Sequence, residues 1–485
     1  MGTGVAVLCE RIMENIDEVI TSLPIDPAAA AALVADLLGH PPDFNVRDLP
    51  TGVQLVFLDS IVNQQRVEEA IIRPLIEGRT GGHFTAAQPA GVSTYGDAVT
   101  ALLGGNVLVA SGSGIVAVSM DHWPKRQPSE PPAEIVPQGP HTGFVEDMEV
   151  NMALLRHLIQ DRRLRCRRIL LGERSPSVTV LVHLEGTART DTVRHVERRL
   201  RAVARAESFA TDTEMVAEWL TRISGSLFPT MEATERPDVA AAALHEGRVL
   251  VLMDGSPVAV MAPTVFVHLI QAPIDYYNRS FDAWTKRLIR LAALGLSVLA
   301  SPVFVAVVTV NQELVPARLF VSVAQNSQGV PLPTLMEVLV MEVIVEMVQE
   351  AGLRMPGALG QTVSIVGAIV IGQSAVMAGL LSAPVVVVVS LAYIASTAVP
   401  SLNARKALRV LRYPLILLGA WLGLFGVMWG LTLLALYLLA LESFGTPYLA
   451  PIAPRRPRGL QDAIRRIPLT DMRRSFLARR RRMPQ

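Results

Sequence analysis

The sequence predicts an α/β cytosolic N-terminal region of two related subdomains, followed by an α-helical integral membrane domain. The chain has 485 residues with 44 Lys and Arg against 43 Asp and Glu, yet residues 291–454 contain only twelve charged side chains. Strand and helix patterns alternate before that region, and apolar runs of membrane-crossing length lie within it. The first twenty residues lack the apolar stretch of a signal peptide, so we expect the N-terminal region to stay in the cytosol.

The first predicted subdomain comprises residues 1–123. We expect strands at 52–59, 106–110 and 115–119 and helices at 61–76 and 95–103. The last two strands flank the sequence Ser-Gly-Ser-Gly, which is typical of a hairpin because glycine reaches positive φ without strain. Six prolines in residues 124–140 then predict an extended linker.

The second predicted subdomain, residues 141–285, repeats this order. We expect a helix from 144 to about 160, a strand at 178–184, helices at 191–204, 212–223 and 238–246, and strands at 248–253 and 257–261. Residues 105–118 align without a gap over 247–260 and share a Val-Leu-Val run and a Val-Ala-Val run. This internal similarity predicts that the two subdomains are related.

The membrane domain is predicted at 286–454, with four to five membrane elements. Apolar runs lie at 292–310, 334–351, 363–381, 384–399 and 414–441. Basic residues before the first run, around Arg405–Arg412, and in the tail at 455–485 each favour the cytosolic side. The basic segments before and after 414–441 cannot both be cytosolic if 414–441 crosses the membrane once. A broken or re-entrant segment would resolve this conflict.

Acidic residues make the run at 334–351 the most informative membrane element. At 100° per residue, Glu342, Glu346 and Glu350 fall within an arc of about 80°, and Glu337 lies one to two turns earlier. One interpretation is a cation pathway, because such a helix repeated around an axis makes rings of carboxylates. The other is an interfacial amphipathic helix with a solvated acidic face.

Other candidate residues carry weaker signals. Gln373 and Ser374 interrupt an apolar, glycine-containing run, which is typical of close helix packing and alternatively of a pore lining. The arginines of the tail favour contact with anionic membrane lipid or a solvated tail. The sequence contains no phosphate-binding loop, catalytic elbow or metal-ligand spacing, so we expect neither an enzyme nor a cofactor. A net charge of +1 argues against nucleic-acid binding.

Four blocks resemble the A subunits of spore germinant receptors, the GerA family. The blocks are residues 263–290, 330–356, 360–380 and 443–454, and in the N-terminal region Gly139-Pro140 and Glu235–Val239 are also similar. Stage V sporulation protein AF, a close relative of that family, shares much of the pattern. Gln138, His141 and Ile274 depart from residues common in the family, which puts the electrostatic role of the linker in doubt.

The resemblance implies a protein of the spore inner membrane that acts in germination. It implies B and C germinant receptor subunits as partners and a homo-oligomeric ring that releases monovalent cations when a nutrient binds. Within that frame we expect the cytosolic subdomains to assemble or gate the ring while the membrane domain conducts. Two alternatives stay open, an AF-type amplifier channel of germination and a non-conducting membrane scaffold for germination partners.

Overall fold

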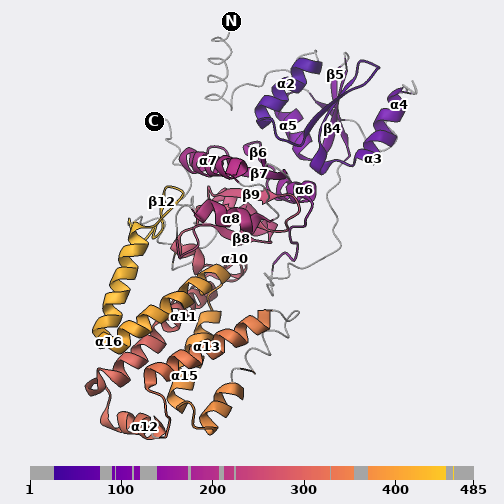
Figure 1. Cartoon of the computed structure of the whole chain (residues 1–485). Helices are drawn as coiled ribbons and strands as arrows, with labels where there is room; N and C mark the ends of the chain where they lie inside the picture. Colours follow the sequence, from indigo (N-terminus) through magenta and orange to yellow (C-terminus); the bar gives the residue numbers. More distant parts are fainter. Residues whose placement is uncertain are drawn as a thin grey trace.

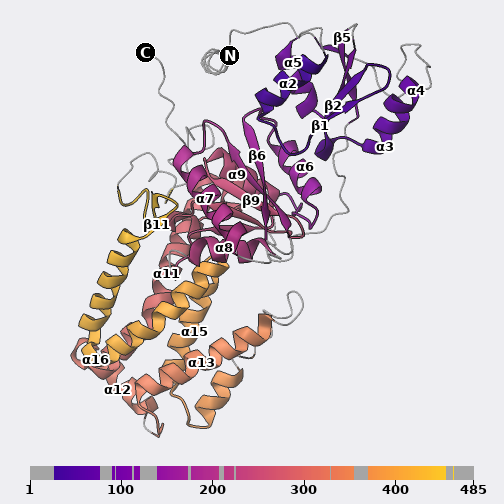
Figure 2. The same cartoon turned by 45° about the horizontal axis from the view of Figure 1, so that its top comes forward.

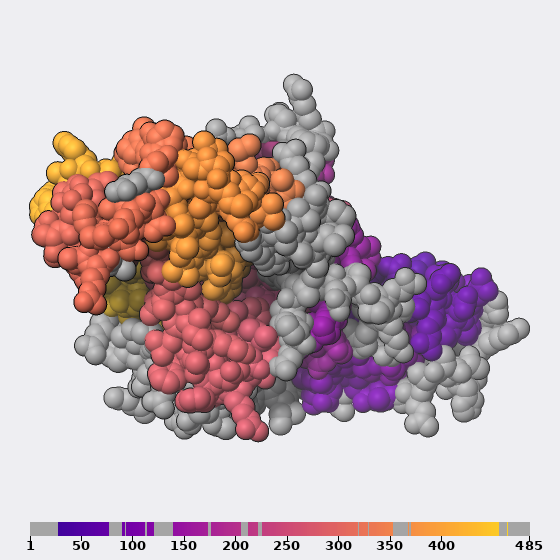
Figure 3. Space-filling view, turned by 90° about the horizontal axis from the view of Figure 1, so that it is seen from below, coloured from indigo at the N-terminus to yellow at the C-terminus, as the bar shows by residue number. Residues whose placement is uncertain are grey.

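The computed structural model contains two α/β subdomains stacked on a group of long helices (Figure 1). It describes residues 27–76, 90–92, 94–111, 114–120, 139–172, 176–206, 212–222, 226–327, 329–353, 367, 370–454 and 463. Most of the predicted proline-rich linker, most of the basic tail and part of the run at 363–381 lie outside these residues. Viewed from below, the first subdomain and the helical part lie toward opposite sides of the molecule (Figure 3).

The first subdomain is a five-stranded antiparallel sheet with order β1-β2-β4-β5-β3. Its elements are α2 (Pro27–Leu38), β1 (Phe44–Asp48), β2 (Gln54–Leu58), η1 (Asp59–Ile61), α3 (Gln64–Val67), η2 (Glu68–Ile72), α4 (Arg73–Ile76), β3 (Ala90–Val92), α5 (Tyr95–Leu103), β4 (Asn106–Ser111) and β5 (Gly114–Ser119). Helix α5 begins where the Thr94 hydroxyl accepts a hydrogen bond from the Asp97 amide at 3.1 Å. Apolar side chains of α2, α5 and the sheet form one core.

The second subdomain has the equivalent strand order, β6-β7-β9-β10-β8. Its elements are α6 (Met148–Leu158), β6 (Leu164–Leu171), β7 (Ser177–Leu184), α7 (Thr190–Ala206), α8 (Thr213–Arg222), β8 (Glu232–Thr234), α9 (Pro237–His245), β9 (Val249–Met253) and β10 (Ala259–Ala262). Helices α6 and α9 cover one face of the sheet, and α7 and α8 cover the other (Figure 2). The sheet therefore has an apolar core on each side.

The shared strand order confirms that the two subdomains are related. Hairpin β4–β5 occupies the same position in its sheet as β9–β10. The two hairpins differ in register, because Val109 pairs with Val116 whereas the equivalent Val251 pairs with Val260. This shift of two residues keeps every side chain on its original face of the sheet.

A buried ion pair joins the two subdomains. Arg156 of α6 is 2% exposed and donates two hydrogen bonds to the Asp43 carboxylate, at 2.6 and 2.8 Å. The Ser60 hydroxyl donates to the same carboxylate at 2.5 Å. Arg165 of β6 also donates to the Leu37 carbonyl at 3.0 Å. Because α6 follows the predicted linker in the chain, these contacts hold the two sheets together independently of the linker.

Two short helices, η3 (Phe266–Leu269) and α10 (Ile274–Tyr277), end the second subdomain. The helical part that follows consists of α11 (Ser280–Thr309), η4 (Gln312–Leu314), α12 (Ala317–Ser327), α13 (Thr334–Leu353), α15 (Ala383–Thr397), α16 (Leu402–Ala440), β11 (Glu442–Ser443) and β12 (Thr446–Pro447). Among the described residues, α11 and α16 are long and apolar enough to cross a membrane.

Helix α16 is broken at Gly423, where φ is 64° and ψ is −149°. Asn311, just after α11, accepts a hydrogen bond from the Leu424 amide at 2.8 Å, and a Cβ at Gly423 would overlap its side chain. The chain reverses there, so both ends of α16 lie beside the second subdomain (Figure 2). A break of this kind would allow the basic segments at 405–412 and 455–485 to lie on the same side of a membrane.

Several boundaries differ from expectation. A helix and a strand, α2 and β1, precede the first predicted strand, and α6 begins at Met148, four residues later than predicted. Strand β6 was not predicted, because its sequence Leu-Arg-Cys-Arg-Arg-Ile-Leu-Leu lacks a clean alternation of apolar and polar residues. The first apolar run extends back to Ser280, since the amphipathic residues before it continue the same helix.

Candidate functional site

The acidic helix α13 is anchored at its first turn by Glu337. This side chain is 1% exposed, and its carboxylate accepts a hydrogen bond from the Ser382 amide at 2.7 Å. Ser382 is the residue that precedes α15, so the carboxylate satisfies an amide at the positive end of that helix. Glu337 therefore fixes the start of α13 to the start of α15.

Glu342 connects three helices. Its carboxylate pairs with Arg412 of α16 at 2.6 Å and accepts a hydrogen bond from the Ser301 hydroxyl of α11 at 2.7 Å. The side chains of Glu342 and Arg412 are 4% and 5% exposed. A buried carboxylate requires such partners, because an unpaired charge in apolar surroundings is strongly unfavourable.

Glu346 forms an ion pair with Arg409 one helical turn from the first pair. Its side chain is 42% exposed, and Glu350, one further turn along, is exposed. Gln373 and Ser374 lie in a helical stretch at 370–377, where both are exposed. The structure thus directs Glu337, Glu342 and Glu346 to neighbouring helices and leaves the other three candidates at the surface.

We name the two pairs Glu342–Arg412 and Glu346–Arg409 the ion-pair ladder. Glu residues four apart on α13 meet Arg residues three apart on α16, in opposite chain directions. Residues at these spacings share one helical face, which is why both pairs form between the same two helices. The ladder lies beside an apolar core that includes Val338, Met341 and Val345.

The start of α11 is attached to the second subdomain through Asp275. The Asp275 side chain is fully buried and accepts hydrogen bonds from Arg287 at 3.1 Å and from Arg290 at 2.7 Å. Arg290 also donates to the Ile270 carbonyl at 3.2 Å. We call this cluster the entry joint, because the chain enters the helical part there.

A second cluster, at the start of α9, adjoins the entry joint in the chain through Tyr277. Tyr277 donates its hydroxyl proton to the Asp238 carboxylate, which also pairs with the buried Arg236 at 2.8 Å. Burial and the neighbouring carboxylate raise the pKa of Tyr277 to about 12. A Cβ at Gly139 would lie 2.8 Å from the Tyr277 ring, so only glycine allows this close approach.

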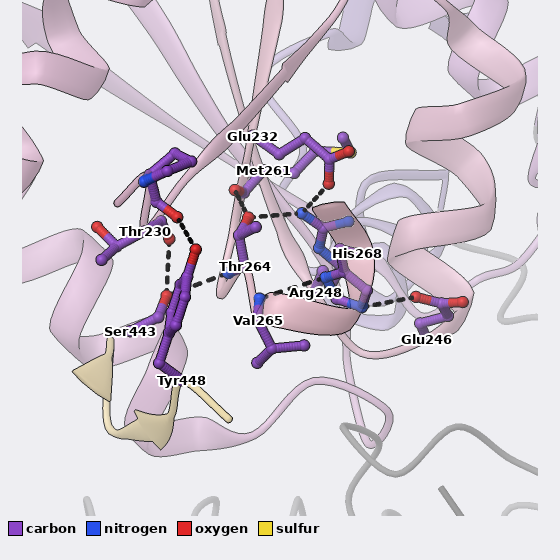
Figure 4. Close-up of polar contacts among 11 residues, drawn as sticks. Thr230, Glu232, Glu246, Arg248, Met261, Thr264, Val265, His268, Ser443 and Tyr448 are labelled. Carbon is purple, nitrogen blue, oxygen red and sulfur yellow. Dashed lines mark hydrogen bonds and ion pairs between the residues drawn. The ribbon is translucent and has the colours of Figure 1, made fainter. Parts of the chain in front are cut away.

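The end of the helical part is attached to the same sheet (Figure 4). The Ser443 hydroxyl donates to the Thr230 carbonyl at 2.7 Å and accepts from the Thr264 amide at 3.1 Å. The Tyr448 hydroxyl donates to the Pro229 carbonyl at 3.1 Å. We call this cluster the exit joint. It ties residues that are 179 to 219 positions apart in the sequence.

A buried arginine and histidine support the exit joint from the sheet side. Arg248 donates to Glu232 at 2.8 Å and to the Thr264 hydroxyl at 2.9 Å. His268 Nδ1 accepts from the Val265 amide at 3.4 Å, and its Nε2 lies 4.0 Å from Glu246 (Figure 4). Burial, with a further effect of Arg248, holds the pKa of His268 well below its usual value of 6.5.

Neither joint could be located from the sequence as a site. Apart from Pro229 and Thr230, the residues of both fall in blocks 263–290 and 443–454, so the resemblance marked the segments but gave no contacts. Arg409 and Arg412 were interpreted as markers of the cytosolic side, and their pairing with α13 was missed. Within the described ranges there is no cluster of three or more His, Cys, Asp or Glu that could hold a metal ion.

Comparison with known proteins identifies the family. Residues 32–476 match the family described as Bacillus/Clostridium GerA spore germination protein. The chain is 32% identical over 454 residues to Spore germination protein KA of Bacillus subtilis (strain 168), covering 89% of this chain and 82% of that protein. It is 33% identical over 427 residues to Uncharacterized membrane protein YfkQ of the same strain, covering 85% and 83%.

One solved structure is also similar, the N-terminal domain of the A subunit of the Bacillus megaterium spore germinant receptor GerK3. It matches 51% of this chain and 99% of that domain at 20% identity, with a TM-score of 0.39. The family match covers both subdomains, both joints and the ion-pair ladder. The chain belongs to the GerA family of spore germination proteins.

Proposed function

We propose that this chain is the A subunit of a spore germinant receptor and forms a homo-oligomeric, nutrient-gated cation channel. In this proposal the helical part is integral to the spore inner membrane, and the two α/β subdomains lie in the cytosol. B and C germinant receptor subunits are its protein partners. Family membership supports the role in germination, and the two apolar helices and the membrane relative support the location.

The acidic helix α13 carries the proposal of a cation pathway. Glu337, Glu342, Glu346 and Glu350 account for all the acidic residues between 314 and 441, an otherwise strongly apolar stretch. Carboxylates at membrane depth are costly and face partners or water. Repeated around an oligomer axis, the exposed carboxylates would attract cations and exclude anions.

The α/β subdomains are proposed to gate this pathway. The entry and exit joints tie both the first and the last long helix to the second sheet, so a change in that sheet reaches α11 and α16 together. A nutrient signal received by a partner subunit can in this way alter the helical part without contacting it directly.

Ion flux through the purified full-length protein in liposomes tests the channel. We expect potassium efflux above that of protein-free liposomes, with potassium favoured over chloride. Glu350→Gln should lower this selectivity, because it removes an exposed carboxylate of α13, whereas Glu313→Gln outside α13 should leave it unchanged. Absence of flux from the assembled wild-type protein and from every variant would favour the non-conducting scaffold.

A further inference from the structure

We infer that the ion-pair ladder holds the cation pathway closed, and that the pathway opens when α13 separates from the first half of α16. This inference rests on the proposed channel and assigns its regulation to four residues. Glu342 and Glu346 are the gate carboxylates, and Arg412 and Arg409 are the groups that occupy them.

The charges explain why the observed arrangement is closed. Each guanidinium lies where a permeating cation would have to bind, in direct contact with the carboxylate. A carboxylate that is neutralised at contact distance exerts little attraction on a second cation. Glu342 is additionally satisfied by the Ser301 hydroxyl, so both of its oxygens have partners. The Glu342 and Glu346 carboxylates are therefore unavailable to cations here.

The packing explains why α13 is the element that moves. The start of α13 is fixed to α15 through Glu337, and the ion-pair ladder ends at Glu346. One side of α13 is exposed along its length, with Met336, Val340, Val343 and Met347 between 41% and 67% exposed. A rotation about the Glu337 contact would separate the ladder without loss of packing on that side, while the opposite face, with Val338, Met341 and Val345, would slide in its apolar core.

The joints explain how the ladder is controlled. The first half of α16, which carries Arg409 and Arg412, begins in an apolar core shared with Phe228 and Leu269 of the second subdomain. Its second half ends at the exit joint, where Tyr437 also accepts a hydrogen bond from the Leu227 amide at 3.0 Å. Because α16 is held at both ends by the same subdomain, a shift of that subdomain carries the arginines with it and leaves α13 behind.

The first test replaces the Glu342–Arg412 pair by uncharged residues of similar shape. In the full-length protein in potassium-loaded liposomes, Glu342→Gln/Arg412→Gln should raise unstimulated potassium efflux about tenfold, since a pair that contributes roughly 1.4 kcal/mol to closure shifts the equilibrium tenfold. The exchange Glu342→Arg/Arg412→Glu should return efflux to the wild-type level. The matched control Arg167→Gln/Glu197→Gln removes a surface ion pair of the second subdomain and should change nothing.

The second test joins positions 346 and 409, the site of the half-exposed ion pair, by a chemical cross-link. Cys166 is buried, and burial raises the pKa of its thiol to about 12, so it should not react. In a Cys9→Ser background, Glu346→Cys/Arg409→Cys should leak potassium until a short bis-maleimide joins the two thiols, and the leak should then stop. This test stands even where the buried double variant fails to fold.

The outcomes separate the inference from the proposed function. No potassium flux from wild type or any variant would overturn the channel itself. Flux that is equal in wild type and the folded Glu342→Gln/Arg412→Gln variant, or that persists after cross-linking, would overturn the ladder as a gate while leaving the channel in place.

Discussion

The two α/β subdomains share a strand order but differ in what they bury. Among the described residues, Ser60 is the only polar side chain buried in the first subdomain. The second buries many, including Arg156, Arg236, Arg248 and Asp275. Arg156 reaches the first subdomain and Asp275 reaches α11, whereas Arg236 and Arg248 pair within their own subdomain. The first subdomain is therefore stabilised mainly by apolar packing, whereas the second also holds neighbouring parts of the chain through polar contacts.

The difference shows what duplication of a fold permits. Both copies keep the apolar hairpin that builds a stable sheet. In the second copy, buried polar residues such as Arg156 and Asp275 are satisfied by partners outside the subdomain, so they depend on those contacts. Perturbing a polar residue of the second subdomain that contacts α11 or the segment after α16 should therefore disturb the helical part, and perturbing Ser60 should not.

The largest effect is expected at the entry joint. Asp275→Asn removes the charge that faces Arg287 and Arg290, both of which would remain near each other with Arg287 fully buried. Breaking a buried ion pair from one side costs about 3–5 kcal/mol, so we expect a large fall in Tm and in the amount of membrane-inserted protein. Ser60→Ala, its counterpart in the first subdomain, should cost only about 1 kcal/mol. Equal losses for the two variants would contradict the comparison.

Acid should weaken the second subdomain before the first. Burial lowers the pKa of His183 to about 4, from an ordinary value of 6.5, so the folded chain keeps this side chain neutral while the unfolded chain binds a proton below pH 6.5. Its contribution to stability is therefore complete above pH 6.5 and declines as the pH falls toward 4. Between pH 7 and pH 5 we expect a loss of about 2 kcal/mol in denaturant titrations.

His183→Gln should make that pH dependence shallower. The lowered pKa of His268 acts in the same direction, so some dependence should persist in the single variant and disappear further in His183→Gln/His268→Gln. The described residues of the first subdomain include no buried histidine. A pH dependence that is unaffected by both substitutions would show that other groups dominate it.

A smaller effect is expected at the exit joint. Tyr448→Phe keeps the buried ring and removes only the hydroxyl that donates to the Pro229 carbonyl, at a cost of about 1 kcal/mol. Tyr448→Ala also removes the ring from the core shared with Phe228, at about 3–5 kcal/mol. Thermal unfolding of the detergent-solubilised protein measures both. If Phe is as damaging as Ala, the hydrogen bond matters more than the packing.

Local sequence signals predicted the repeated hairpins and most helices. The Val-Leu-Val and Val-Ala-Val runs alternate with turn residues, so β4, β5, β9 and β10 could be placed within about two residues. Strand β6 could not, because Arg165 and Arg167 gain their partners from Leu37 and Glu197, far away in the chain. Contacts with residues far away in the chain stabilise β6, whereas its own sequence pattern does not predict a strand.

The acidic face of α13 was visible in the sequence, but its surroundings were not. Spacing alone put Glu342, Glu346 and Glu350 on one side of a helix, as the helix at 334–353 allows. Which of them is buried depends on Arg412 and Arg409, more than sixty residues later. The role of these glutamates as a pathway stays a prediction for the flux measurements above.

The exit joint also has a consequence for biosynthesis. Thr230 and Thr264 are made long before Ser443 and Tyr448, and the hairpin at Gly423 must form before the chain can return to them. Until then, the apolar site that receives Phe444 stays uncovered. The second sheet is completed only by a chain whose long helices have already been placed, so its final packing depends on the folding of the helical part.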